Sequence, residues 1–479
     1  MSYVITDRKP ASVFRFFEEI SAIPRGSYHE DRIADHLVAF AKERGLECYR
    51  DELHNVLIKK PATAGQEGRA PILFQGHTDM VCEKNGDVEH DFLKDPLELY
   101  VEGKFLRAKG TTLGADNGIA VAMMMAMLDG EISSHPAIEC LFTTAEEVGL
   151  NGAQGFDYSR IHARRMVNMD SEASGWITAG CAGGVRSDLT LNAVMEPFAG
   201  EALRVRLTGL MGGHSGENIN CGRANANKLM GRLLAELIAV QDMRLLKLDG
   251  GSKDNAIPRE CEALIAVADA ERASDLLSEG AVRIAGELSA EDRGFRVTVE
   301  TADAEAVMMS AMDTRRAVTL LCCAANGVLA MSRDVKGLVE TSRNLGVVTT
   351  EGDAVSFIFS SRSSVESRLD ASILELDTLA AALGCSSRHY SRYPGWDYAK
   401  TSAVRDAYLA AYRDVMGEDA QINVIHAGLE CGIIRSKVPD MDMISIGPDM
   451  KDIHSPDEAL DLDSTERFWQ TVVRLVEIL

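Results

Sequence analysis

Short apolar runs that alternate with helical patterns constrain the fold of this chain more than any other feature. The runs PILFQG, AIECLFTT and RRMVNMD have the length of buried strands. Between the strands, DRIADHLVAFAKERG (residues 31–45) places Ile33, Leu37 and Phe40 on one helical face and ends in basic residues before Gly45. Strands that alternate with helices are typical of α/β proteins. We therefore predict an α/β layer with a central mixed, mainly parallel sheet.

The pattern changes at about residue 186. EALRVRLTGL and FRVTVE alternate with period two, as half-exposed strands do, whereas RANANKLMGRLLAELIAV and DASILELDTLAAALG have the spacing of long amphipathic helices. The α/β pattern returns after Pro394 and Gly395 and ends in a helix, for which Asp463 followed by Glu466 offers a capping signal. We predict one domain formed by residues 1–185 and 395–479, and an inserted α+β domain formed by residues 186–394.

The length of the chain bears on its number of domains, and its net charge limits the classes of molecule that it is expected to bind. A chain of 479 residues is longer than one hydrophobic core usually serves, which agrees with two domains. The excess of 73 acidic over 50 basic residues gives a formal charge of -23, so neither nucleic acid nor an anionic membrane surface is an expected partner. The longest apolar run, Ile119 to Leu128, is too short for the ~20 residues that span a bilayer. The N-terminus lacks a signal-peptide core and the ten cysteines form no CxxC pair, so we expect a cytoplasmic protein with reduced thiols.

Polar residues gather where the predicted strands end, which is where ligands bind in open α/β sheets. They are His77 and Asp79 in GHTDM, Asp116 in GADNG, Glu146 and Glu147 in TAEEVG, Asp170 in MDSE, and His454 in HSPDE. No single one is diagnostic, because a lone Asp at a strand end is more often a helix cap or a surface group than a ligand. Together they provide two imidazoles and five carboxylates, an excess of negative charge that two divalent cations would neutralise. A shared carboxylate, with one His and one further carboxylate on each cation, would use five groups and leave two for other duties.

The order of these motifs resembles the co-catalytic dinuclear zinc exopeptidases, which include carboxypeptidases, aminoacylases, dipeptidases and tripeptidases. Within them the chain most resembles, nearly from end to end, the aminoacyl-histidine dipeptidases (peptidase D), which cleave carnosine. The resemblance implies two zinc ions: His77 and Asp170 hold one, Glu147 and His454 hold the other, and Asp116 bridges them. It further implies that Glu146 is the general base, that Asp79 orients His77, and that the peptide bond after Asp116 is cis. Cobalt or manganese would also suit these ligands.

The same resemblance implies that the inserted domain is a lid through which the chain forms a homodimer. His214 in MGGHSGEN would polarise the scissile carbonyl, often from the partner subunit. Asn255 in KDNAIPRE, Arg362 in SSRSS and Gly428 in HAGLECG would contact the substrate, with Arg362 suited to a terminal carboxylate. The plainer alternatives are a structural histidine in a tight turn for His214 and a surface ion pair for Arg362.

The function implied is hydrolysis of dipeptides, of the Xaa-His type with a broader range, by a metal-bridged water whose proton Glu146 removes. The preference for histidine comes only from the resemblance. An N-acyl amino acid amidohydrolase or a tripeptidase of the same family stays open as an alternative. A second alternative, from another class, is an inactive metal-stabilised binding or scaffold protein; the intact Glu146 argues against it, because a scaffold has no use for a base.

Overall fold

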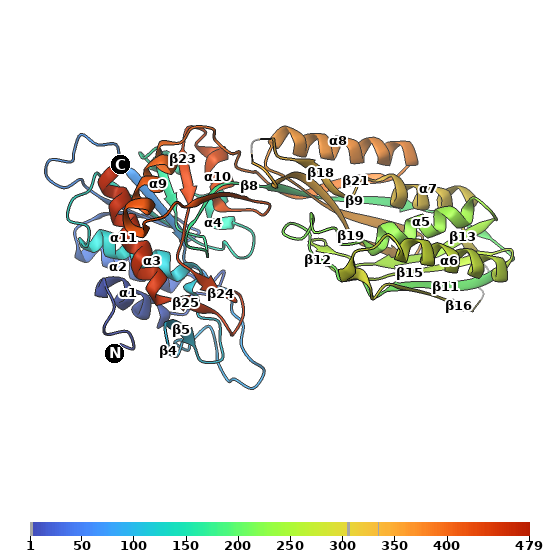
Figure 1. The fold of residues 1–479 in the computed structure, drawn as a ribbon, viewed down its shortest axis with the longest axis horizontal. Coiled ribbons are helices and arrows are strands. Elements are labelled where there is room, and N and C mark those ends of the chain that lie inside the picture. The colour runs from blue at the N-terminus through green and yellow to red at the C-terminus, as the bar shows by residue number, and fades with distance from the viewer. Residues whose placement is uncertain (1–2, 304–306, 334) are drawn as a thin grey trace. The chain divides into compact units, whose positions relative to one another are not determined.

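The computed structural model describes residues 3–303, 307–333 and 335–479, and the chain divides into two compact units (Figure 1). The first unit comprises the chain up to Gly180, Trp396–Val424 and Leu429–Leu479. The second comprises Cys181–Gly395 together with the short segment Ile425–Gly428. Each unit has its own cluster of buried apolar side chains. The predicted α/β class with an α+β insertion is confirmed.

An eight-stranded sheet forms the centre of the first unit. Its order is β1 (Glu47–Arg50), β2 (Val56–Lys60), β6 (Ile138–Thr143), β3 (Ile72–His77), β7 (Arg165–Asn168), β23 (Asp442–Ser445), β8 (Trp176–Cys181) and β22 (Gln421–Ile425). The central strands β6, β3, β7 and β23 pair in parallel, whereas β1, β2 and β6, and likewise β23 and β8, pair antiparallel. Every residue of β3 and β6 is buried, which explains why their sequences are continuous apolar runs rather than alternating ones.

Helices cover this sheet and complete the first core. They are α1 (Ala11–Ser21), α2 (Asp31–Glu43), α3 (Ala115–Asp129), α4 (Asn151–Gly155), α9 (Ala403–Met416), α10 (Glu430–Lys437) and α11 (Leu462–Ile478), with the short 3-10 helix η1 (Tyr158–Arg160). Helix α3 packs against α1 (Figure 1) and is buried on all sides up to Leu128, in keeping with the apolar sequence that follows Gly118. A smaller sheet contains β24 (Met450–Lys451), β25 (Ala459–Asp461), β5 (Phe105–Ala108) and β4 (Leu99–Glu102). Among the described residues, no helix combines the length and the apolar character needed to cross a membrane.

The start of α11 differs from the predicted capping signal. The cap is Asp461, whose carboxylate accepts a hydrogen bond from the amide of Ser464 at 3.0 Å. Asp463 and Glu466 instead bind the guanidinium of Arg8. A capping carboxylate must precede the first turn to reach the free amides, and Asp461 occupies that place because the helix begins at Leu462.

A nine-stranded antiparallel sheet forms the second unit. Its strands are β16 (Arg296–Thr301), β11 (Glu201–Thr208), β15 (Cys261–Val267), β13 (Met243–Gly250), β19 (Val339–Glu351), β20 (Ala354–Ser363), β9 (Gly183–Asn192) and β21 (Ser386–Tyr393) in that order, and β18 (Gly327–Met331) pairs with β19. The helices are α5 (Ala226–Ile238), α6 (Ala270–Ala285), α7 (Ala311–Cys323) and α8 (Glu366–Leu383), with the 3-10 helix η2 (Ala290–Asp292). Two short ribbons pair β10 (Met195–Pro197) with β17 (Val307–Met309) and β12 (Gly213–His214) with β14 (Ala256–Ile257).

Candidate metal centre

Loops at the ends of the first unit's strands bring the predicted polar residues together. His77 is the last residue of β3, Glu146 and Glu147 follow β6, and Asp170 follows β7. Because β3, β6 and β7 run in parallel, their carboxyl ends lie at one edge of the sheet. Asp116 lies at the start of α3 and His454 follows β24, so all of these residues belong to the first unit.

Two groups of potential metal ligands share Asp116. In the first, Nε2 of His77 lies 3.1 Å from Oδ1 of Asp116 and 3.3 Å from Oδ1 of Asp170. In the second, Nε2 of His454 lies 3.1 Å from Oδ2 of Asp116 and 3.1 Å from the carboxylate of Glu147. Within each group, one donor atom from each residue lies within 4.8 Å of the others. The two oxygens of Asp116 thus face different groups, each of which could hold one divalent cation.

The negative charge of this cluster of carboxylates favours the binding of cations. Burial raises the pKa of Glu146 well above its usual value, and the neighbouring carboxylates of Asp170 and Glu430 add to the effect. Burial by itself lowers the pKa of His77, but the carboxylates of Asp170 and Asp116 outweigh it and raise the pKa well above the usual value. Hydrogen bonds with Asp116 and Glu147 raise the pKa of His454 to about 10. Without cations, these side chains must therefore carry extra protons. Two divalent cations would balance the negative charge of the carboxylates without those protons.

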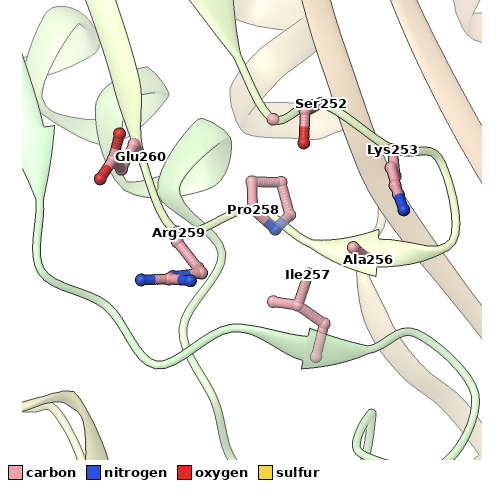
Figure 2. Close-up of a pocket in the computed structure, with 8 residues that line it drawn as sticks. Ser252, Lys253, Ala256, Ile257, Pro258, Arg259 and Glu260 are labelled. Carbon is pink, nitrogen blue, oxygen red and sulfur yellow. The ribbon is translucent and has the colours of Figure 1, made fainter. Parts of the chain in front are cut away.

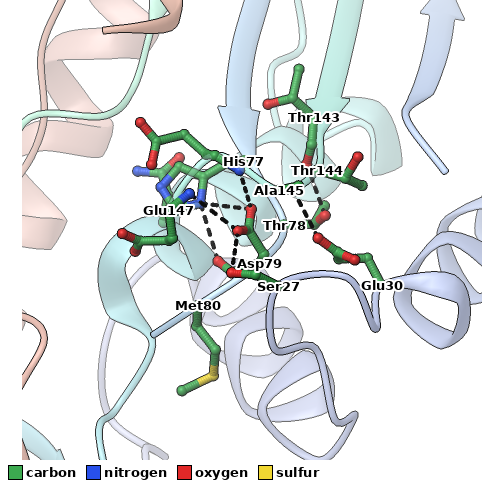
Figure 3. Close-up of polar contacts among 12 residues, drawn as sticks. Ser27, Glu30, His77, Thr78, Asp79, Met80, Thr143, Thr144, Ala145 and Glu147 are labelled. Atoms are coloured by element: carbon green, nitrogen blue, oxygen red, sulfur yellow. Dashed lines mark hydrogen bonds and ion pairs between the residues drawn. The ribbon is translucent and has the colours of Figure 1, made fainter. Parts of the chain in front are cut away.

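Asp79 contacts both His77 and the backbone of the glutamate pair (Figure 3). Its carboxylate lies 3.4 Å from Nδ1 of His77, on the side of the ring away from Asp116, and its backbone oxygen lies 3.1 Å from the same nitrogen. The carboxylate also accepts hydrogen bonds from the amides of Glu146 and Glu147 at 3.1 and 3.3 Å, and from the hydroxyl of Ser27 at 2.8 Å. Of these contacts, only the one with His77 was expected from the sequence. Asp79 therefore positions both the histidine and the backbone of the glutamate pair.

The backbone before the glutamate pair has an unusual conformation. Ala145 has φ of 48°, in the left-handed region that residues other than glycine seldom adopt. Its amide donates a hydrogen bond of 2.8 Å to the buried carboxylate of Glu30, also drawn in Figure 3. Such conformations are retained where the surroundings enforce them, often at functional sites. Glu30 carries no motif of its own, which is why sequence analysis missed it.

The peptide bond between Asp116 and Asn117 is cis, which confirms the prediction. The side-chain amide of Asn117 donates a hydrogen bond of 2.9 Å to the carbonyl oxygen of Met169, the residue before Asp170. This bond connects the loops that carry Asp116 and Asp170, the two aspartates of the first ligand group.

Comparison with known proteins identifies the family. Residues 73–478 match the model of peptidase family M20/M25/M40. This chain belongs to that family. The predicted resemblance is confirmed, and membership makes the chain a peptidase that works with divalent metal ions.

Two relatives resemble the peptidase over almost its whole length. It is 38% identical over 477 residues to the cytosol non-specific dipeptidase of Escherichia coli strain K12, covering 99% of this chain and 98% of the relative. The crystal structure of aminoacylhistidine dipeptidase from Vibrio alginolyticus superposes with a TM-score of 0.93 at 38% identity, covering 98% of this chain and 97% of that chain. The aminopeptidase PepT of Bacillus cereus, at 15% identity and a TM-score of 0.57 over 98% and 99% of the two chains, shares the fold.

A buried carboxylate that no motif analysis singled out lies next to the centre of the peptidase. Glu430, at the start of α10, is fully buried and accepts hydrogen bonds from the side chains of Gln75 on β3 and Thr143 on β6. Burial raises the pKa of Glu430 to about 7. Its signal in the sequence was only its place in HAGLECG, beside Gly428.

Glu430→Gln is expected to change how the stability of the metal-free peptidase depends on pH. The pKa of Glu430 in the folded protein, about 7, lies above the unfolded value of about 4.3, so folding favours the protonated form. The contribution of protonated Glu430 to the free energy of unfolding is therefore complete when the pH lies below the pKa of the unfolded state. It is lost as the pH rises towards and through 7. Between pH 5 and 8 the wild type should lose about 2 kcal/mol relative to the variant, whose amide oxygen can still accept both hydrogen bonds.

Thermal unfolding of both metal-depleted proteins across this pH range would measure the difference. Parallel curves for wild type and variant would contradict the prediction.

In the second unit, β12 and β14 bring His214 and Asn255 together. His214 pairs with Ala256, and the amide of Ser215 donates a hydrogen bond of 2.8 Å to the carbonyl oxygen of Asn255. Nδ1 of His214 accepts a hydrogen bond of 3.2 Å from the amide of Glu217, so a neutral ring carries its proton on Nε2. Burial and the charge of Arg362 lower the pKa of His214, which favours this neutral form.

The second unit contains a cavity of about 400 Å³ (Figure 2). Its lining consists of Gly251, Ser252, Lys253, Ala256, Ile257, Pro258, Arg259 and Glu260. Neither His214 nor Asn255 is part of that lining, although Asn255 lies in the same stretch of sequence, so the cavity is not formed by the predicted residues.

Arg362 and Gly428 both contact Tyr393. Nη1 of Arg362 donates a hydrogen bond of 3.0 Å to the hydroxyl of Tyr393, and Gly428 lies against the ring of the same tyrosine. Next to Gly428, His426 lies 2.7 Å from the hydroxyl of Ser342, and burial lowers its pKa to about 3 with help from Arg362. The four residues that are predicted to contact the substrate, His214, Asn255, Arg362 and Gly428, all lie in the second unit. Tyr393 was missed because it lies 31 residues from Arg362 in the sequence.

Proposed function

We propose that this chain is a dinuclear zinc dipeptidase that hydrolyses Xaa-His dipeptides such as carnosine among a broader range of dipeptides. The observation that carries the proposal is Asp116, which has one carboxylate oxygen in each of two ligand groups, with Glu146 beside them. The names of the two relatives support dipeptides as the substrate class, and one of them supports aminoacyl-histidine substrates. The name of the E. coli relative supports a cytoplasmic location.

In this proposal five residues would hold the two cations. His77 and Asp170 would hold one, Glu147 and His454 would hold the other, and Asp116 would contribute to both sites. Two imidazoles with carboxylate oxygens suit zinc, and they also accept cobalt or manganese. When bound, the cations make water more acidic and polarise the scissile carbonyl.

Glu146 serves as the base in this proposal. Its carboxylate takes a proton from the attacking water and returns it to the leaving amine. Glu147 lies 3.1 Å from His454 and is therefore assigned to the second cation. Glu146 lies with His77 and Glu147 in a third possible ligand group, and we assign it to proton transfer. Asp79 supports both roles, because it holds the ring of His77 and the backbone of both glutamates.

The second unit is proposed to act as a lid and as the surface of a homodimer. His214 would donate a hydrogen bond from Nε2 to the oxygen of the scissile carbonyl, where negative charge develops. Arg362 would bind the free carboxylate of the substrate, and Asn255 and the backbone of Gly428 would contact its main chain. Recognition of the free ends would restrict hydrolysis to short peptides. Sedimentation of the purified chain would test the dimer.

His214→Ala is expected to lower kcat by about 10²–10³-fold, because the variant lacks a donor to the developing negative charge. The cation content should not change, since the proposed ligands all lie in the first unit. Steady-state kinetics and metal analysis would measure both effects.

His389→Ala is a matched control for His214→Ala, because His389 also lies in the second unit and its ring contacts Ser187 and Asp377. A kcat for His214→Ala within a few-fold of the control would contradict the role of His214.

The whole proposal is tested by metal analysis together with a substrate panel. The panel contains carnosine and other Xaa-His dipeptides, further dipeptides, tripeptides and N-acylated amino acids. We expect two cations per chain and hydrolysis of dipeptides. Preference for tripeptides or acylated amino acids would favour the corresponding alternative activity, and bound cations without hydrolysis of any substrate would indicate a scaffold protein.

A further inference from the structure

A fully buried arginine connects two loops of the candidate metal centre. Arg25 follows α1 and is only 1% exposed. Nη1 donates a hydrogen bond of 2.9 Å to the carbonyl oxygen of Thr78, and Nη2 donates one of 2.5 Å to that of Gly114. Thr78 lies between His77 and Asp79, and Gly114 lies two residues before Asp116. The guanidinium therefore bonds to the backbone beside ligands from two different loops.

A buried carboxylate binds the second of these loops through its amides. Glu458, which is 3% exposed, lies four residues after His454. Oε2 accepts hydrogen bonds from the amides of Leu113 and Gly114 at 2.8 and 3.0 Å, and Oε1 accepts from those of Ala115 and Asp116 at 2.8 and 3.3 Å. The loop from Leu113 to Asp116, which includes the first two residues of α3, is thus held by the carboxylate of Glu458 at its amides and by the guanidinium of Arg25 at a carbonyl.

Two glycines leave the space that the guanidinium occupies. A Cβ at Gly114, where φ is 65°, would lie 2.5 Å from Nη2 of Arg25. A Cβ at Gly118 would lie 2.6 Å from the same nitrogen. Side chains at either position would collide with the guanidinium, so the chain around Asp116 is shaped to accept Arg25.

We propose that Arg25 and Glu458 are positioning residues that set the affinity of the cation pair by fixing the loop Leu113–Asp116. The inference rests on the proposed function, in which Asp116 bridges the cations. Because its two oxygens face different ligand groups, a shift of this loop changes both sites together. Replacement of residues that orient metal ligands typically lowers metal affinity by about 10–100-fold.

The two variants Glu458→Gln and Arg25→Lys test the proposal in the full chain. In Glu458→Gln, one carboxylate oxygen becomes an NH2 group, which cannot accept hydrogen bonds from two of the four loop amides. In Arg25→Lys, a single ammonium group replaces the planar guanidinium and cannot bind both carbonyl oxygens with the same geometry. Zinc affinity is measured by competition with a chelator, thermal unfolding is measured without metal, and dipeptide hydrolysis is measured as free zinc is raised. We expect both variants to bind zinc about 10–100-fold more weakly and to regain activity at high zinc.

Matched controls come from the same unit. Glu139 is 3% exposed and accepts hydrogen bonds from the amides of His162 and Ala163, and Arg405 is 5% exposed and donates to the carbonyls of Ala399 and Lys400. Glu139→Gln and Arg405→Lys should therefore share any general cost of altering a buried charge. Their zinc affinity should stay within about twofold of the wild type, since neither side chain bonds to a ligand loop.

The outcomes separate this inference from the proposed function. Wild-type affinity in Glu458→Gln and Arg25→Lys, or equal losses in the controls, would overturn the inference alone. A wild type that bound no divalent cation would overturn the proposed function and the inference with it. If Glu458→Gln did not fold, Arg25→Lys, which keeps the positive charge, would decide by its zinc affinity relative to Arg405→Lys.

Discussion

Glu146→Gln is expected to lower kcat for dipeptide hydrolysis by about 10²–10⁴-fold and to leave the cation content unchanged. The amide has almost the shape of the carboxylate but cannot accept a proton from water. Asp79 would continue to hold residue 146 in place, because it binds the backbone amide and not the side chain. Initial rates with a dipeptide substrate, together with metal analysis of the same sample, would measure both effects.

Glu147→Gln provides the comparison. Its carboxylate lies 3.1 Å from His454 in the second ligand group, so this variant should lose cation binding as well as activity. Full activity in Glu146→Gln would rule out the proposed base. The same loss of cations in both variants would show that the neighbouring glutamates do not divide the two roles.

Asp116→Asn is expected to have the largest effect on metal binding. Asp116 belongs to both ligand groups, with Oδ1 near His77 and Oδ2 near His454, so one substitution weakens both cation sites. We expect loss of both cations at concentrations that saturate the wild type, and a fall in kcat/KM on the order of 10³-fold. Titration with zinc followed by calorimetry would give the number of sites.

Asp170→Asn is the matched control for a single site. Asp170 contacts His77 and belongs to the first ligand group only, so this variant should retain the second cation. If Asp116→Asn kept one cation at wild-type affinity, Asp116 would not bridge the pair.

The elements that sequence analysis predicted best are those whose pattern reflects burial. The all-buried strands β3 and β6 appear as continuous apolar runs, and the half-exposed strand β11 appears as an alternating one. The start of α11 was missed because Asp461 and Asp463 are equally plausible caps by residue type, and only the helix boundary distinguishes them. In the same way, nothing in the residues Ile425–Gly428 separates them from the C-terminal segment, yet they belong to the second unit.

The candidate ligands were predictable because their chemistry is local. Each is a histidine or carboxylate before a helix, directly after a predicted strand or, for His454, a short loop beyond one, and the order of the motifs resembles that of a known family. Arg25, Glu30, Glu430 and Glu458 could not be found in this way. Each acts through hydrogen bonds to residues far away in the sequence, in most cases to their backbone groups, which every residue possesses.

The sequence alone therefore determined the α/β class with its insertion, the family resemblance and the set of residues that gather at the strand ends. Burial periodicity and the identity of titratable side chains carry that information, and both can be read along the chain. Only the tertiary structure decided that Asp116 faces two ligand groups and that Asp79 contacts both a histidine and the glutamate pair. It also decided that the oppositely charged side chains of Arg25 and Glu458 bind the same loop. These features depend on which backbone groups meet in space, and a buried polar group is stable only when such a partner is present.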